Sequence, residues 1–429
     1  MTALSPAAAR RIFLLLTATR WFPVGLIVSA VTLLPIERGL TVTQTLTLAS
    51  LTGLAVFVLE LPTGGTADVL GRRPVLITAA AVQVVAASLY LVAQSFWAFA
   101  VAAVAMGIFR ALDSGPLEAW FVDTVHATTP GADVDRTLSR QGTVLGVSIA
   151  LGALMSGGLV WWHPLPLWSA LTLPYAVYTA LAVGHLVMVC VLLRETSTST
   201  RASPSAATGL RRAVLSARGT PSVVMSGLRL ARGNRVLLGL LVVEAFWAVA
   251  MVVMESFQPI RLAELLDSEE RAGALMGPVA SVGWAVFALG AALGGAASRR
   301  IGVARAAVLA RVLNGLGAAW MGLVAGPAAL VAAYLVTYGL HGSGGPLLRA
   351  LIHREAGAGN RATVLSMASM TGFAAYAVAS PALGWTAEAI STPAAMLIGG
   401  LASVAGAVFL VPAVRREREL RALRTAVSV

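Results

Sequence analysis

Long stretches of this sequence contain no Asp, Glu, Lys or Arg, and they constrain the fold more than any other feature. They include 75–109, 141–193, 272–298, 363–387 and 389–414. About 20 apolar residues cross a bilayer as a helix, so each stretch holds one membrane span or two. Only 12% of the residues are charged, against about 25% in soluble domains, and a soluble fold is therefore a poor interpretation.

Apolar segments of bilayer length predict about twelve spans. Their approximate limits are 12–36, 41–63, 75–95, 97–121, 141–162, 171–193, 236–257, 273–297, 304–325, 328–350, 362–386 and 393–414. An even number of spans places both termini on one side of the membrane. We interpret the N-terminal segment as the first span and not as a cleaved signal peptide, because it carries Arg20 and lacks a clear small-residue cleavage site.

All 31 basic residues are arginine, and the formal net charge is +12. When successive spans alternate in direction, one face of the membrane receives nearly all of the arginines, and the other receives only Arg38, Arg261 and Arg271. The positive-inside rule then places the arginine-rich face and both termini in the cytoplasm, as in a multi-pass protein of the cell membrane (inner or plasma membrane). Because the arginines gather at the ends of apolar segments, nucleic-acid binding is not expected.

A Ser-, Thr- and Arg-rich segment divides the chain into halves of similar length, 1–195 and 235–429, with an expected cytoplasmic linker at 196–234. The halves share short patterns at nearly one offset. G-x-x-x-D-x-x-G at 64–71 recurs as G-x-x-x-R-x-x-G at 295–302, and SGPL at 114–117 recurs as GGPL at 344–347. The sequence therefore predicts an all-α membrane protein with twelve spans in two pseudo-symmetric six-helix bundles, and a binding site near mid-membrane.

The polar segment LPTGGTADVLGRRP, at 61–74, interrupts the apolar sequence between the second and third spans. Its glycines permit tight turns and close helix approach. Asp68 could accept backbone N–H bonds at a helix N-terminus, and Arg72 and Arg73 could pair with a nearby acid. We interpret this loop as a polar latch that holds one conformation and can be released.

At these residues the chain resembles the major facilitator superfamily, whose signature between spans two and three is matched by Gly64, Ala67, Asp68, Gly71, Arg72 and Arg73. The resemblance covers essentially the whole chain through the span count, the linker and the repeat. It implies secondary transport, with the signature aspartate bracing the eleventh span and the arginine paired with an acid at the end of the fourth span, here Asp123.

RALDSG, at 110–115, is similar in part to a second signature of the family. The glycine-rich fifth span lacks the proline of the drug-proton antiporter signature, although ELPTGGTADVLGRR with ATVLS resembles bacterial exporters of drugs or secondary metabolites.

Ionisable residues inside spans are costly and require a partner or a function. The fourth span carries Arg110, Asp113 and Glu118. Arg110 and Asp113 are three residues apart on one helical face, where they could neutralise one another or respond to a proton and a charged substrate.

Four further residues are candidates for the transport pathway. In the seventh span, Glu244 could carry a proton, form a salt bridge to Arg311 or stay a buried neutral acid, and Glu255 could be interfacial. Arg20 could snorkel to the surface or line the cavity, and His341 could line the cavity or be a packing residue.

No catalytic motif, phosphate-binding loop or metal-ligand spacing is present in the sequence, and Cys190 is the one cysteine. The chain is therefore not expected to be an enzyme or to bind a cofactor or metal. Without an ATP site, transport would draw on an ion gradient. The sequence favours a monomeric, proton-coupled exporter of a hydrophobic or amphiphilic small molecule. An importer or facilitator for a nutrient or lipid, a receptor without transport and a membrane-embedded enzyme are the alternatives.

Overall fold

The computed structural model describes residues 4–194, 229, 232–356 and 361–427, and within these ranges the chain is helical apart from short connections. Most of the expected linker, 196–234, lies outside the described residues. The chain divides into two compact units. Unit 1 comprises Met1–Leu40, Leu51–Thr220 and Gly273–Ser281, and unit 2 comprises Thr41–Ser50, Pro221–Ala272 and Val282–Val429.

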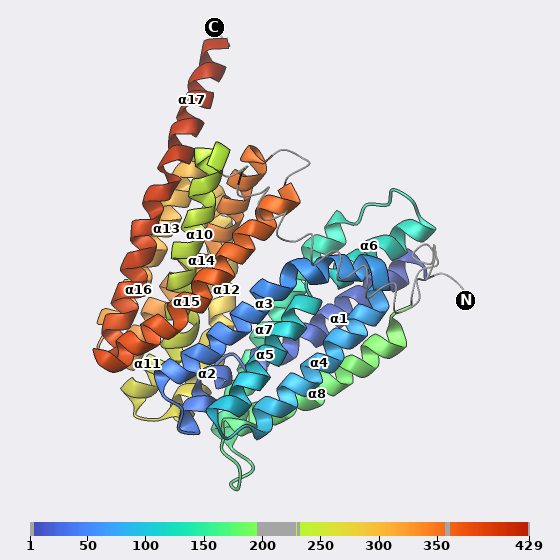
Figure 1. The fold of residues 1–429 in the computed structure, drawn as a ribbon, viewed down its shortest axis with the longest axis vertical. Helices are drawn as coiled ribbons and strands as arrows, with labels where there is room; N and C mark the ends of the chain where they lie inside the picture. Colours follow the sequence, from blue (N-terminus) through green and yellow to red (C-terminus); the bar gives the residue numbers. More distant parts are fainter. Residues whose placement is uncertain (1–3, 195–228, 230–231, 357–360, 428–429) are drawn as a thin grey trace. The chain divides into compact units, whose positions relative to one another are not determined.

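The helices α1 to α8 belong to the first half of the chain (Figure 1). They are α1 Pro6–Leu26, α2 Ala30–Glu37, α3 Val42–Leu70, α4 Arg72–Val92, α5 Phe96–Leu112, α6 Pro116–Thr128, α7 Asp135–Trp162 and α8 Thr172–Leu192. Within unit 1, α1 packs against α7 and α8, and α4 packs against α5 and α8. The stacked rings of Phe13 and Phe121, with centroids 4.6 Å apart, join α1 to α6 in the apolar core.

The second half contains the remaining helices (Figure 1). They are α10 Arg235–Val252, the π-helix η1 Val253–Phe257, α11 Gln258–Leu266, α12 Glu269–Ile301, α13 Val303–Leu323, α14 Pro327–Glu355, α15 Arg361–Ala389, α16 Thr392–Gly406, the 3₁₀ turn η2 Ala407–Leu410 and α17 Val411–Val427. Within unit 2, α13 packs against α14 and α16, and α10 packs against α15 and α16.

Eleven helical segments in the described part of the chain are long and apolar enough to cross a bilayer. The expected tenth span corresponds to α14, which has 29 residues and is therefore also long enough. It is less apolar than the others because its second half contains Gly, Ser, His and Arg. The expected fold of membrane-spanning helices is confirmed.

Polar caps fix where many of these helices begin. Ser5, Ser95, Ser268 and Ser391 each accept a hydrogen bond from the backbone N–H three residues later. Asn234 caps α10 in the same way, through the N–H groups of the second and third residues after it. These side chains satisfy N–H groups that have no partner within the helix, so the connections can stay short.

The internal repeat is visible in backbone geometry. Gly71 precedes α4 with φ 93° and ψ 157°, and Gly302 precedes α13 with φ 97° and ψ 154°. Both helices have 21 residues. This region of φ disfavours residues with a Cβ atom, so the same tight turn has been kept in both halves by glycine.

Three expected boundaries are wrong. The segment 61–74 is not a loop, because α3 continues to Leu70 and α4 begins at Arg72, which leaves Gly71 as the only residue between them. The fourth span is not one helix, since Asp113, Ser114 and Gly115 separate α5 from α6. The first span is likewise divided, between α1 and α2, and begins at Pro6 instead of residue 12.

Candidate functional site

A buried ion pair joins the first and fourth spans in unit 1. Arg20 Nε lies 2.6 Å from Asp113 Oδ2, and the two side chains are only 7% and 16% exposed. The Arg20 guanidinium also lies over two aromatic rings, 4.7 Å from the centroid of Trp21 and 4.2 Å from that of Phe109. Aromatic faces attract a cation, so these rings help to hold the guanidinium in an apolar environment.

The ion pair leaves hydrogen-bonding capacity unused. Arg20 Nη1 is buried and has no partner among the described residues. A guanidinium has five N–H donors, and buried donors normally find acceptors. Arg20 can therefore donate to a further group, such as a water molecule or a polar atom of a bound molecule.

Asp113 lies at the break in the fourth span. It follows Leu112, the last residue of α5, and Gly115 adopts the left-handed conformation with φ 93° before α6 begins at Pro116. Asp113 is paired with Arg20 in this structure. Arg110, three residues earlier, is exposed and acts electrostatically on Glu60.

Other polar groups of unit 1 are paired with one another. Glu118 on α6 accepts a hydrogen bond from the Gln141 amide on α7, so this acid has a partner outside the Arg20–Asp113 pair. His185 on α8 is buried and its Nδ1 lies 2.9 Å from Thr19 Oγ1 on α1. The sequence interpretation missed His185, although it lies within the uncharged stretch 141–193. It is on α8, which packs against α1.

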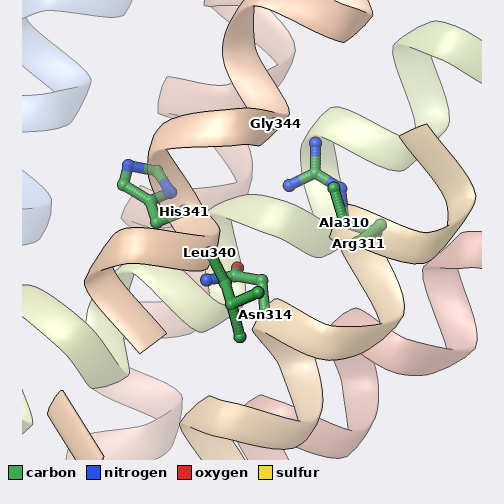
Figure 2. A pocket seen from close by; sticks show the side chains of 6 residues that line it. All are labelled: Ala310, Arg311, Asn314, Leu340, His341 and Gly344. Carbon is green, nitrogen blue, oxygen red and sulfur yellow. The ribbon is translucent and has the colours of Figure 1, made fainter. Parts of the chain in front are cut away.

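In unit 2, residues of α13 and α14 line a narrow pocket that leaves no space for a water-sized molecule in this structure (Figure 2). It is lined by Ala310, Arg311, Asn314, Leu340, His341 and Gly344. Arg311 is only 5% exposed, and its guanidinium lies 5.7 Å from the Trp247 ring centroid. Trp247 Nε1 donates to His341 Nδ1 at 3.2 Å, and the two rings are stacked with centroids 5.4 Å apart.

Glu244 on α10 interacts electrostatically with Arg311, which lines this pocket, and with Arg349. Within the described part of unit 2, neither Glu244 nor Arg311 forms an ion pair at 4.0 Å or less. The salt bridge that the sequence left open between them is therefore absent. Arg311 could have been identified from the sequence by the rule that selected Arg20, because it is a charged residue inside a predicted span.

His341, which lines this pocket, also contacts a cluster of aromatic side chains. Tyr334 and Tyr338 stack on α14 with centroids 5.2 Å apart, and Tyr338 contacts Trp284, Phe287 and His341. His341 thus lies between a charged group and an aromatic surface. Glu255, on the π-helix, is exposed and acts electrostatically on both tyrosines.

Equivalent positions of the two halves carry a buried amide. Gln83 on α4 and Asn314 on α13 are 231 positions apart and are 0% and 2% exposed. Gln83 donates to Tyr178 Oη, and Asn314 donates to the Thr337 carbonyl. The carbonyl oxygen of each amide has no partner among the described residues. Each unit therefore contains a buried amide oxygen that can accept a hydrogen bond, and in unit 2 it lies in the pocket that Arg311 also lines.

The expected latch residues are partly described. Gly64 and Asp68 lie within α3, and the Asp68 side chain is outside the described part of the structure. Arg72 Nε lies 3.5 Å from Asp123 Oδ2, which is the pairing that the resemblance implies. Arg73 pairs with no acid among the described side chains and donates instead to the Cys190 carbonyl at 3.0 Å, near the end of α8.

Several solved structures of transporters have folds similar to this one. The chain matches a nucleoside transporter, NupG, with a TM-score of 0.75 and 11% identity, over 94% of this chain and 98% of that one. It matches a peptide transporter, POT, in complex with sulfate with a TM-score of 0.69 and 15% identity, over 95% and 94%. A structure described for proton dependent oligopeptide transporters matches with a TM-score of 0.68 and 13% identity, over 96% and 99%.

A comparison with curated proteins found no match. The model of the Major Facilitator Superfamily matches residues 13–380, which is most of the chain. Together with the helices of bilayer length, this match makes the protein a multi-pass membrane transporter of small molecules, and not an enzyme. The chain belongs to the Major Facilitator Superfamily of secondary transporters.

Proposed function

We propose that this transporter exports a hydrophobic or amphiphilic small molecule in exchange for protons. The observation that carries the proposal is the buried Asp113 carboxylate, which is paired with Arg20 at a break in the fourth span. Protonation of Asp113 removes its charge and releases the Arg20 guanidinium. The pair then has two states that differ by one charge, and a substrate that binds one state better shifts the equilibrium between them.

Glu244 is the second candidate for the proton site. It lies in the field of Arg311 and Arg349 without direct contact to either, so a change in its charge alters the electrostatics of the whole pocket. Transfer of one elementary charge across 100 mV supplies about 2.3 kcal/mol, which is enough to accumulate a substrate roughly 50-fold. We expect alternating access of the halves 1–195 and 235–429, with the Arg72–Asp123 pair stabilising one of the two states.

The aromatic cluster of unit 2 supports an amphiphilic substrate. Trp284, Phe287 and Tyr338 offer ring faces to an apolar body, and His341 and Arg311 offer polar contacts at one side of it. Binding pockets for small molecules commonly combine such apolar walls with a few polar groups.

The test begins with a ligand. Purified protein is screened for thermal stabilisation by a panel of amphiphilic compounds, and a stabilising compound is then loaded into proteoliposomes with an imposed pH gradient. We expect the parent to move this compound uphill and Asp113→Asn to move it only downhill. Asp133→Asn, which neutralises an exposed acid of the same unit, is the matched control. Uphill transport at the parent rate by Asp113→Asn would remove Asp113 from the mechanism.

Uptake of a polar nutrient is the second candidate function, and the buried, unpaired Arg311 beside the open Asn314 Oδ1 favours it. These groups would bind an anionic or hydrogen-bonding part of a substrate. Counterflow measured with nucleosides and short peptides, set against the amphiphilic compounds, separates the two functions. The pocket has no space for a substrate in this structure, so binding would require it to open, and Arg311→Gln should abolish exchange of an anionic substrate.

We further propose that the working unit is a monomer in the cell membrane, with both termini and residues 196–234 in the cytoplasm. The arginine distribution supports this orientation. The chain has one cysteine, so a Cys190→Ser background allows single cysteines to be placed at residues 194–235 and labelled in intact cells. Labelling by an impermeant reagent from outside would contradict the orientation.

A further inference from the structure

A groove on unit 2 combines arginine and aliphatic side chains outside the proposed transport site. It lies between α13 and the segment that begins α17, and its volume is about 590 Å³. The lining residues are Arg305, Val308, Leu309, Val312, Val411, Val414, Arg415 and Arg418. Leu309 and Val411 are 48% and 39% exposed, so the groove is open to the surroundings of the protein and not to its core.

The lining is ordered along the groove. On α13 the lining positions are 305, 308, 309 and 312, and on α17 they are 411, 414, 415 and 418, so each helix contributes one face with the spacing i, i+3, i+4, i+7. α13 begins near Arg305, whereas α17 reaches Arg415 and Arg418 after its valines. The helices pack with opposite directions, since α17 follows α16 and η2 along α13. The three arginines therefore gather at one end of the groove and the aliphatic side chains at the other.

These arginines carry uncompensated charge. Among the described residues, none of the three forms an ion pair. The other basic side chains nearby do, because Arg354 and Arg421 pair with Glu417, and Arg416 pairs with Glu419. Glu417 is turned toward the backbone N–H groups of Val303 and Ala304 and is not part of the lining. No acidic side chain among the described residues therefore neutralises the positive end of the groove.

We propose that this groove binds an anionic phospholipid, with its phosphate headgroup at Arg305, Arg415 and Arg418 and an acyl chain along the aliphatic end. Guanidinium groups suit phosphate because they donate two parallel hydrogen bonds to its oxygens. A basic pocket between membrane helices is a site where acidic headgroups bind. A free phosphate would use the arginines but not the valines and Leu309, so the aliphatic lining identifies a lipid as the occupant.

The experiment uses the purified full-length protein in detergent and counts retained lipids by native mass spectrometry. Phosphatidylglycerol and phosphatidylcholine with the same acyl chains are titrated separately. We expect tighter binding of phosphatidylglycerol to the parent, and a loss on the order of 100-fold in that affinity when Arg305, Arg415 and Arg418 are all changed to glutamine. The matched control removes three charges at exposed arginines outside the groove, through Arg136→Gln, Arg140→Gln and Arg416→Gln. This control variant should bind phosphatidylglycerol with the affinity of the parent protein.

Two further arms keep the proposal falsifiable. The triple Arg→Lys variant retains the charges and should keep the preference for phosphatidylglycerol, with weaker binding because lysine lacks the planar pair of donors. Inorganic phosphate at millimolar concentration should not displace the lipid. Equal binding of both lipids by the parent, unchanged binding in the glutamine variant or displacement by free phosphate would each overturn the proposal. Because lipid retention is measured without transport, failure of the exporter proposal would leave this result unaffected.

Discussion

The fourth span and its counterpart, the tenth, began from related sequences but fold differently. In the first half, α5 ends at Leu112 and α6 begins at Pro116, with Asp113 between them. In the second half, α14 continues from Pro327 to Glu355 through the equivalent proline, Pro346. The broken span carries the buried carboxylate, and the continuous one carries the aromatic side chains and His341.

A difference of one residue accounts for this divergence. The segment from Phe96 to Pro116 is one residue longer than the segment from Pro327 to Pro346. A continuous helix with the extra residue would rotate everything that follows by about 100°, since a turn contains 3.6 residues. The left-handed Gly115 takes up this residue, and Asp113, which pairs with Arg20, lies at the break. The comparison shows how an insertion can break a span next to a buried charge.

The largest effect should come from removing one partner of the buried pair. Arg20→Met leaves Asp113 as a buried charge without its cation, and we expect the free energy of unfolding to fall by about 3–5 kcal/mol. The double variant Arg20→Met with Asp113→Leu should recover most of this loss, because no uncompensated charge is left. Unfolding in mixed micelles measures both.

Arg311→Met tests the other half of the comparison. Arg311 has no carboxylate within 4.0 Å in the described structure, so its removal should change the free energy of unfolding by no more than about 1 kcal/mol. Equal losses for Arg20→Met and Arg311→Met would mean that the two buried arginines have the same structural role.

The second effect concerns the equivalent turns at Gly71 and Gly302. Beside Gly302, Glu417 accepts from the backbone N–H groups of Val303 and Ala304 at 3.1 and 2.9 Å. Glu417→Ala should therefore lower the free energy of unfolding by about 2 kcal/mol, because it removes a charged helix cap. Asp123→Ala, at the other turn, removes an ion pair whose carboxylate is half exposed, and should cost less than about 1 kcal/mol in the same unfolding assay. A larger loss for Asp123→Ala would contradict this ranking.

Hydropathy and local motifs could predict the spans and the repeat, and the resemblance to the family implied the Arg72–Asp123 pair. They could not predict the Arg20–Asp113 pair, which joins residues 93 positions apart in the sequence. The end of α3 was also missed, since glycines at 64 and 65 indicate a turn while the backbone there remains helical. The pocket that Arg311 and Asn314 line depends on the packing of α13 on α14, which no local pattern contains.

The third effect tests the break itself. Gly115→Ala places a Cβ atom at φ 93°, and we expect a loss of about 1–2 kcal/mol in unfolding free energy from left-handed strain. Gly345→Ala is the matched change in the continuous helix. Its Cβ would meet only the end of the Arg349 side chain, at 3.5 Å, so it should be neutral or stabilising by about 0.5–1 kcal/mol. A stabilising Gly115→Ala would show that the fourth span can become continuous.

The smallest effect distinguishes the buried histidines of the two units. Trp247 Nε1 can only donate, so His341 Nδ1 must accept, and the neutral His341 ring carries its proton on Nε2. The Thr19 hydroxyl near His185 can donate or accept, and it also lies 3.3 Å from the Leu16 carbonyl, so it does not impose one tautomer. Trp247→Phe should lower the free energy of unfolding by about 1 kcal/mol and allow His341 to adopt either tautomer. Thr19→Val should lower the free energy of unfolding by about 1 kcal/mol or less. Nitrogen NMR of labelled histidine reads the tautomers directly, and a mixed population at His341 in the parent would contradict this assignment.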